Sequence, residues 1–191
     1  MKYLSDELNL VSIVDPILKI APKKFDFDEN DGKEIASKLR LKMAELGGVG
    51  LSANQVGLDM SVMVLGVRNP KNDEQFERVC FNPVMIGASE RVCFNPVVIG
   101  VNEEEIVMQE GCLSIPGLRL NIKRPTECTI TYFDAEQKEH TERFLGLAAR
   151  IALHEYDHML GFNFMSRVSK FKLDRAMKSL NKRVKAFNRR H

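Results

Sequence analysis

Residues 146–161 read GLAARIALHEYDHMLG, and the arrangement of the rest of the chain depends on this stretch. Its apolar and alanine residues suit a closely packed central helix over residues 146–160, which Gly161 ends. His154 and His158 are four residues apart and therefore lie one turn apart on the same face of that helix. Because the helix is apolar, the two imidazoles are expected to be buried, and buried polar groups need partners.

The two histidines flank a glutamate, and this pattern indicates a metal site. Two imidazole nitrogens at this spacing can bind one metal ion, and Glu155 can act as a base for a metal-bound water. Metal hydrolases usually keep three protein ligands and leave one position open for water. Cys112, in the segment EGCLS at residues 110–114, is the best candidate for the third ligand. The set predicts a metal-assisted amide hydrolase rather than a surface helix with two unrelated histidines.

A ligand set of one cysteine and two histidines narrows the choice of metal. Thiolate donates more charge than carboxylate, so the ion is expected to be a weaker Lewis acid. Zn(II), Fe(II), Co(II) and Ni(II) accept imidazole and thiolate, whereas Mg(II) and Ca(II) do not. Cys112 could instead be a nucleophile with His154 as its base, but His158 and Glu155 would then have no role.

The composition is that of an ordinary globular protein. Hydrophobic residues make up 44% of the 191 residues, which fits one domain or one domain with a short appendage. No apolar run approaches the roughly 20 residues of a membrane span. Residues 1–7 carry acids early and lack the apolar core of a signal peptide, so we expect a cytoplasmic protein. Disulfides are not expected there, and Cys128 is interpreted as a small core residue.

Outside the histidine helix, the pattern alternates between short strands and helices. A stripe of apolar residues predicts a helix over residues 31–46, and residues 48–55 are interpreted as a loop of small residues. A buried strand is expected at residues 61–67, and a hairpin at residues 128–134 and 138–144. We therefore predict an α+β fold. In this fold, antiparallel or mixed sheets pack around the central helix, and a further helix lies at the C-terminus.

A tandem duplication interrupts this pattern. Residues 78–90 read RVCFNPVMIGASE and residues 91–103 read RVCFNPVVIGVNE, so that ten of thirteen positions are identical. Two near-identical strands compete for one place in a sheet, which makes the pairing register ambiguous. One interpretation is an insertion tolerated on a surface loop. The other is a functional flap near the site.

The C-terminal segment is strongly basic. Residues 166–191 contain ten Lys and Arg side chains and one acid, a net charge of +9, whereas the remaining residues carry −7. An apolar stripe predicts a helix over residues 172–190, formed by Leu173, Met177, Leu180, Val184 and Phe187. We expect residues 1–165 to form a catalytic domain and residues 166–191 a basic helical extension. The extension either covers the core as a solvated helix or binds a polyanionic partner.

Three motifs in this order resemble those of the peptide deformylases. They are GVGLSANQ at residues 48–55, EGCLS at 110–114 and LHEYDHMLG at 153–161. The segment DPILK at residues 15–19 also resembles the N-terminal part of the family, so the resemblance runs from about residue 14 to 164. The chain departs from the family at Leu153, where glutamine is usual, and at Ser52 and Asn54. It also carries a first repeat copy that the family lacks.

The resemblance implies an enzyme that removes the N-formyl group from the initiator methionine of nascent chains. The ion, expected to be Fe(II) with Zn(II), Ni(II) or Co(II) as alternatives, would be held by Cys112, His154 and His158. Metal-bound hydroxide would attack the formyl carbon, and Glu155 would take the water proton and pass it to the leaving amine. The developing oxyanion would accept hydrogen bonds from the Gln55 amide and the backbone N–H of Leu113.

The same resemblance assigns the substrate and a partner. The backbone of Gly50 would pair with the peptide, and Val49 and Ile151 would help to line the methionine pocket. Arg119 would lie at the pocket rim, unless it is a solvated loop charge, and Glu110 could pair with Arg124. The basic helix would dock on ribosomal RNA.

Two rival functions remain open at this point. One is a zinc endopeptidase that uses the same helix, although such enzymes usually take their third ligand downstream. The other is an inactive ribosome-binding module, which would have no need of Glu155.

Overall fold

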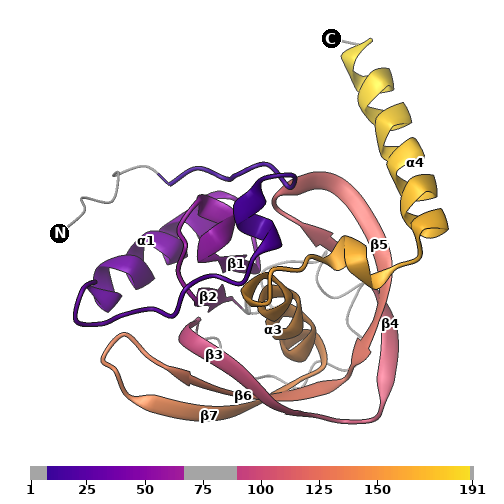
Figure 1. Ribbon diagram of the computed structural model, residues 1–191. Coiled ribbons are helices and arrows are strands. Elements are labelled where there is room, and N and C mark those ends of the chain that lie inside the picture. Colours follow the sequence, from indigo (N-terminus) through magenta and orange to yellow (C-terminus); the bar gives the residue numbers. More distant parts are fainter. Residues whose placement is uncertain (1–7, 67–89, 190–191) are drawn as a thin grey trace.

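A computed structural model describes residues 8–66 and 90–189 of the chain (Figure 1). Residues 67–77 and the first copy of the duplication, apart from Glu90, lie outside these residues. The second copy forms a strand of the larger of the two sheets. The described part combines helices with antiparallel sheets, so the predicted α+β fold is confirmed.

The predicted histidine helix is confirmed as α3, Gly146–Met159, and the strands curve around it in Figure 1. Nearly all of its side chains are buried, including the charged ones. Leu160 caps the helix, and Gly161 follows with a positive φ of 73°. A helix buried on every side has to be enclosed by other elements, and the sheets of this fold supply that enclosure.

The larger sheet has the strand order β1-β2-β3-β6-β7, and every pairing in it is antiparallel. Its strands are β1 Gly50–Ser52, β2 Val62–Leu65, β3 Arg91–Val101, β6 Glu127–Phe133 and β7 Glu139–Leu145. The predicted strand at 61–67 and the predicted hairpin therefore exist. The interpretation of residues 48–55 as a loop was wrong for residues 50–55, which lie in β1 and the short helix η2, Ala53–Val56. A three-residue strand depends on its partner, β2, and leaves no periodic signal in the sequence.

A second sheet consists of β4, Glu105–Cys112, and β5, Ile115–Pro125, paired in antiparallel register from Glu105↔Pro125 to Cys112↔Ile115. Sequence reasoning did not predict this pair. On β5 the buried positions alternate with exposed ones and include Arg124, so the strand is charged on both of its faces. The pair delivers Cys112 to the centre of the molecule.

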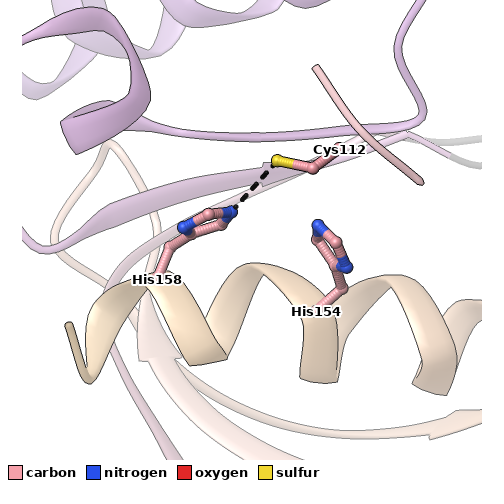
Figure 2. Close-up of side chains that lie close together, drawn as sticks. All are labelled: Cys112, His154 and His158. Carbon is pink, nitrogen blue, oxygen red and sulfur yellow. Dashed lines mark hydrogen bonds between the residues drawn. The ribbon is translucent and has the colours of Figure 1, made fainter. Parts of the chain in front are cut away.

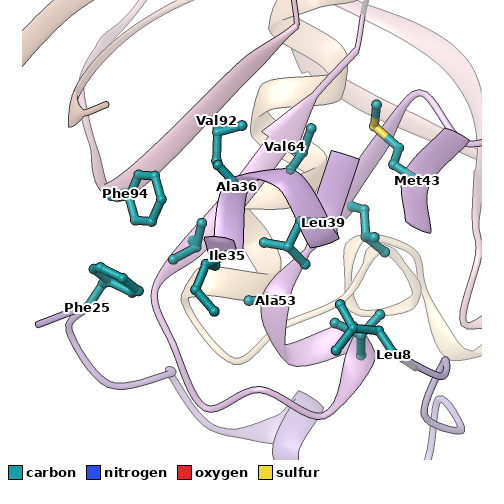
Figure 3. Close-up of a cluster of buried hydrophobic side chains, with 13 residues drawn as sticks. Leu8, Phe25, Ile35, Ala36, Leu39, Met43, Ala53, Val64, Val92 and Phe94 are labelled. Atoms are coloured by element: carbon teal, nitrogen blue, oxygen red, sulfur yellow. The ribbon is translucent and has the colours of Figure 1, made fainter. Parts of the chain in front are cut away.

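The predicted first helix is confirmed as α1, Gly32–Glu45. Asp31 caps it by accepting hydrogen bonds from the backbone N–H groups of Lys33 and Glu34. Its buried face packs into a hydrophobic cluster with the aromatic rings of Phe25 and Phe94, whose centroids are 4.7 Å apart (Figure 3). Another cluster, on the side of α3 that faces β6, contains Cys128, as its interpretation as a core residue predicted. Ahead of α1 lies the short helix η1, Pro16–Lys19.

The C-terminal helix is α4, Lys170–Asn188, preceded by the short helix η4, Phe164–Arg167. Only three of the five residues of its predicted apolar stripe pack against the domain. Leu173, Met177 and Leu180 pack against the cluster next to Cys112, but Val184 and Phe187 are 48% and 64% exposed. The end of α4 projects away from the domain (Figure 1). None of the helices in residues 8–66 and 90–189 is long and apolar enough to cross a membrane.

The turn after α3 yields a test of the close packing around the site. A Cβ on Gly161 would lie 2.6 Å from the carbonyl carbon of Ile20, whereas a Cβ on Gly146, which also has positive φ, meets nothing. We expect Gly146→Ala to lower the free energy of unfolding by about 1–2 kcal/mol, the cost of a left-handed residue. Gly161→Ala should cost about 1–3 kcal/mol more because of overpacking. Urea unfolding of both variants measures this, and equal losses would contradict the predicted backbone clash.

Candidate metal centre

Three ligand atoms meet between the end of β4 and the face of α3. The Sγ of Cys112 and one ring nitrogen from each of His154 and His158 all lie within 4.8 Å of one another, and all three residues are buried (Figure 2). The Sγ of Cys112 is 3.5 Å from Nε2 of His158. The structure thus brings together the residues that the sequence nominated as ligands, although Cys112 is 42 positions away from His154 along the chain.

The chemistry of this set fits a transition metal ion. Imidazole nitrogen and thiolate sulfur are donors that Zn(II), Fe(II), Co(II) and Ni(II) accept. Burial lowers the pKa of His158 to about 3, so its imidazole is neutral and can act as a ligand. Burial alone would lower the pKa of His154 as well. The hydrogen bonds of His154 with Cys112 and Glu110 outweigh the effect of burial, and the pKa is raised to about 10. An ion must therefore compete with a proton at His154.

Glu110 orients the first histidine. One of its carboxylate oxygens, Oε2, lies 2.9 Å from Nδ1 of His154, which leaves Nε2 to face the metal position. The same carboxylate accepts hydrogen bonds from Arg124, at 2.7 and 3.0 Å, and from Arg150, at 2.9 Å. Burial tends to raise the pKa of Glu110, but the hydrogen bonds from His154 and Arg124 prevail and lower it to about 2. The predicted pair with Arg124 is confirmed, whereas the contact with His154 was missed.

Arg124 also connects α3 to the second sheet. Its Nη1 lies 2.9 Å from Oδ2 of Asp157 and donates to the carbonyl oxygen of Leu153 at 3.2 Å. Asp157 is paired with Arg167 as well. Leu153, which replaces the family's usual glutamine, packs its side chain among the apolar residues beside α3. The position therefore contributes a backbone acceptor and an apolar side chain.

Glu155 lies beside the ligands and close to β1. A Cβ on Gly50 would come within 2.5 Å of Oε1 of Glu155, so only glycine allows the strand to approach this carboxyl group. Burial raises the pKa of Glu155 to about 7, near the value that suits a group taking up and releasing a proton at neutral pH. Its Oε2 is buried and has no hydrogen-bond partner in the described part of the protein. A water molecule on a neighbouring ion would satisfy such an atom.

Gln55 contacts the thiol of Cys112 through its side-chain amide. Its Nε2 donates to Sγ of Cys112 at 3.2 Å and to Oγ of Ser114 at 3.3 Å. Its Oε1 accepts from both the N–H and the hydroxyl of Ser52, each at 2.9 Å, which fixes the amide orientation. The neighbouring Asn54 donates to the carbonyl oxygen of His158. The residues that depart from the family pattern, Ser52 and Asn54, therefore both support the site.

The structure also places the other residues that the sequence analysis named. Val49 and Ile151 belong to the same apolar cluster, beside α3. Leu113 follows Cys112, and its side chain packs against the cluster around α1. Arg119 is exposed on β5, and its guanidinium group lies over Gly111. This position is compatible with a role at the rim of a binding site.

A family model described as polypeptide deformylase matches residues 7–174. The chain belongs to this family. The peptide deformylase of Christiangramia forsetii is 36% identical over 176 residues, which cover 86% of this chain and 83% of that protein. That of Rhizobium meliloti is 31% identical over 176 residues, covering 92% and 93%. The crystal structure of the Ehrlichia chaffeensis deformylase in complex with actinonin has a TM-score of 0.77 and 27% identity, covering 92% of this chain and 96% of that one.

As a deformylase, the protein is a hydrolase that uses a divalent metal ion, and the Cys/His/His centre is the candidate for its site. Sequence reasoning missed the buried charged residues that surround the ligands of this deformylase site. Arg150 and Asp157 are charged residues within the helix motif itself, and their burial could have been suspected from the apolar helix. Their partners could not, because Glu110 and Arg124 lie on strands that were not predicted.

The hydrogen bond between Glu110 and His154 yields a prediction about metal affinity. Glu110→Gln keeps the shape but removes the charge that orients His154 and pairs with two arginines. We expect it to weaken metal binding about 10- to 100-fold. Competition between the protein and a chelator for Co(II) measures this. Glu105→Gln, on the same strand with an exposed Lys123 partner, is the matched control. Equal affinity in both variants would show that Glu110 does not orient the ligand.

Proposed function

We propose that this deformylase acts on formyl-methionyl nascent peptides with a metal ion bound by Cys112, His154 and His158. The observation that carries the proposal is the meeting of these three ligand atoms beside the buried Glu155. A divalent ion there lowers the pKa of the water it binds and polarises the formyl carbonyl. Fe(II) is the proposed native ion, because imidazole and thiolate suit it and the family uses a divalent metal.

The side chains around the ion divide the remaining tasks. Glu155 takes the proton from the attacking water and returns it to the amine that leaves. The Nε2 group of Gln55 and the backbone N–H of Leu113 donate to the oxygen of the formyl group as it gains negative charge. Support for the role of Gln55 comes from its amide, which already points at Sγ of Cys112.

The substrate peptide is proposed to extend the larger sheet. β1 lies at the edge of the strand order and, in the described part of the chain, pairs only with β2. A peptide can therefore hydrogen-bond to the backbone of Gly50 as an added strand. Val49 and Ile151, from the cluster beside α3, are the proposed lining of the methionine pocket, and Arg119 the charge at its rim.

An endopeptidase is the second candidate, but its third ligand would normally come from downstream of the helix. The segment downstream of His158 contributes η4 and α4, and no metal ligand from it joins the centre in the described residues. Cleavage of unformylated peptides would favour this alternative. A catalytically inactive module is disfavoured by the buried Glu155.

The role of Glu155 is tested by a conservative change. Glu155→Gln keeps the size of the side chain but removes its ability to carry a proton. The rate of formate release from a formyl-methionine tripeptide should fall about 10²–10⁴-fold, the usual worth of a general base. Metal content should stay unchanged, and Glu139→Gln on the exposed part of β7 should behave as the parent. Full activity in Glu155→Gln would refute the mechanism.

The proposed metal is tested by loading the metal-free protein under anaerobic conditions with Fe(II), Ni(II) or Zn(II). We expect Fe(II) and Ni(II) to support rapid formate release and a chelator to abolish it. Exposure of the Fe(II) form to air should cost activity that the Ni(II) form keeps. Activity that persists after complete metal removal would overturn the assignment of the centre.

The basic extension at residues 166–191 is proposed to dock on ribosomal RNA, in the cytoplasm where nascent chains are made. Lys178, Lys182 and Lys185 are exposed on α4, and no ion pair engages the helix within residues 90–189. Unpaired cations on a projecting helix can contact phosphates without first breaking internal bonds.

Changing these three lysines to glutamate should abolish co-sedimentation with ribosomes at low salt. Activity on the tripeptide should remain, because α4 lies outside the metal centre. The control changes Lys19, Lys24 and Lys138, exposed residues of the catalytic domain, and alters the net charge by the same amount. Loss of ribosome binding in both variants would indicate a general charge effect and count against docking through α4.

A further inference from the structure

The duplicated segment has a structural consequence because its second copy is a strand of the central sheet. β3 pairs with β2 through residues 91–94 and with β6 through its later residues. Its side chain at Phe94 is completely buried against Phe25 (Figure 3). Asn95 has a φ of 51°, and its side chain both donates to and accepts from the backbone of Phe25. These contacts fix the strand in its place.

Every side chain that makes these contacts occurs twice in the sequence. Residues 78–84 read RVCFNPV, and so do residues 91–97. The ion pair of Arg91 with Glu142, the buried Val92, Cys93 and Phe94, and the amide of Asn95 therefore all have an identical counterpart. The side chains of a strand decide which position in a sheet it can occupy. Because the two copies share these side chains, either copy can make the contacts that β3 makes.

Two of the three positions that differ make contacts that favour the described register. Val98, replaced by Met85 in the first copy, packs against the core beside α3. Asn102, replaced by Ser89, donates to Oγ1 of Thr126 at 2.6 Å and accepts from the N–H of Glu127 at 2.9 Å. The third difference, at Val101, is exposed. The preference thus rests on one core contact and two hydrogen bonds, which is a small margin.

The connections allow either copy to enter the sheet. Leu65 and Arg91 are register partners at the neighbouring ends of β2 and β3, so the chain between them only has to return to its starting point. Residues 66–77 suffice for that, because short hairpin connections are common. The thirteen residues gained between β3 and β4 would enter the connection before β4, where Glu103 and Glu104 are exposed and extra length costs little.

We propose that β3 is an exchangeable strand, for which residues 78–88 replace residues 91–101 in a minor state of the folded protein. The metal centre survives this exchange, because β4 is held by its pairing with β5 and Glu110 is held by arginines from β5 and α3. The chain therefore carries a spare copy of one of its core strands.

The test is whether the spare copy rescues a damaged β3. Phe94→Asp puts a charge into a completely buried site and should prevent folding in a chain without a spare. Here we expect it to give folded, metal-loaded protein with formate release close to the parent and an unfolding midpoint about 5 °C lower. Phe81→Asp alone should be silent. The double variant Phe94→Asp/Phe81→Asp should give no folded protein.

Phe25→Asp is the matched control, because Phe25 packs in the same aromatic cluster and occurs only once. It should be as damaging as the double variant. The proposal is overturned if Phe94→Asp alone fails to fold as Phe25→Asp does. It is equally overturned if the double variant folds as well as Phe94→Asp, since Phe81 would then contribute nothing.

Thiol labelling tests the exchange in the parent enzyme. Cys93 on β3 and Cys128 on β6 are 0% and 1% exposed, but only Cys93 has a counterpart in the sequence. On metal-loaded protein, maleimide should modify Cys93 at least about tenfold faster than Cys128, because local exchange is more frequent than global unfolding. Phe81→Asp should remove that difference, as judged by mass spectrometry of the peptides. Equal rates for the two thiols in the parent enzyme would refute the exchange.

Discussion

The helix α3 carries two imidazoles and two carboxyl groups into the centre of the molecule, and this burial is the constraint that the rest of the structure meets. A buried polar group is costly unless it has a partner, and a buried charge is costlier still. Almost all of α3 is enclosed, with His154, Glu155, Asp157 and His158 among the buried residues. The larger sheet and the second sheet supply much of the enclosure, the second sheet brings Glu110 and Arg124 to α3, and η2 brings Asn54.

The second sheet supplies most of the charge. Glu110 and Arg124 lie on neighbouring strands and reach α3 together, where Glu110 meets His154 and Arg124 meets Asp157. Arg150 of α3 completes the network through Glu110. Such a network is worth little as a source of stability, because desolvation offsets the attraction between its members. Its value lies in orientation, since it holds the ligand imidazole in one direction without blocking the face that meets the ion.

The parts of the chain that lie outside this centre are less tightly constrained. α4 packs through its first turns beside β5 and then extends away from the domain with exposed lysines. β3 is held by side chains that the sequence contains twice. In the described residues, neither α4 nor β3 contributes a side chain to the buried charged network around Glu110 and Arg124.

The sequence by itself determined the helices, the main hairpin and the three ligand candidates, because spacings of two and four residues are local and are readable from the chain. His154, Glu155 and His158 were fixed relative to one another by one helix, and the EGCLS segment nominated Cys112. Only the tertiary structure decided how Glu110 meets His154, 44 positions away, and how Gln55 meets Cys112, 57 positions away. Those contacts depend on β1 and on the pair β4–β5, whose strands are too short or too charged to show a pattern and form only against a partner. Local periodicity therefore identified the ligands, whereas long-range pairing decided what orients them.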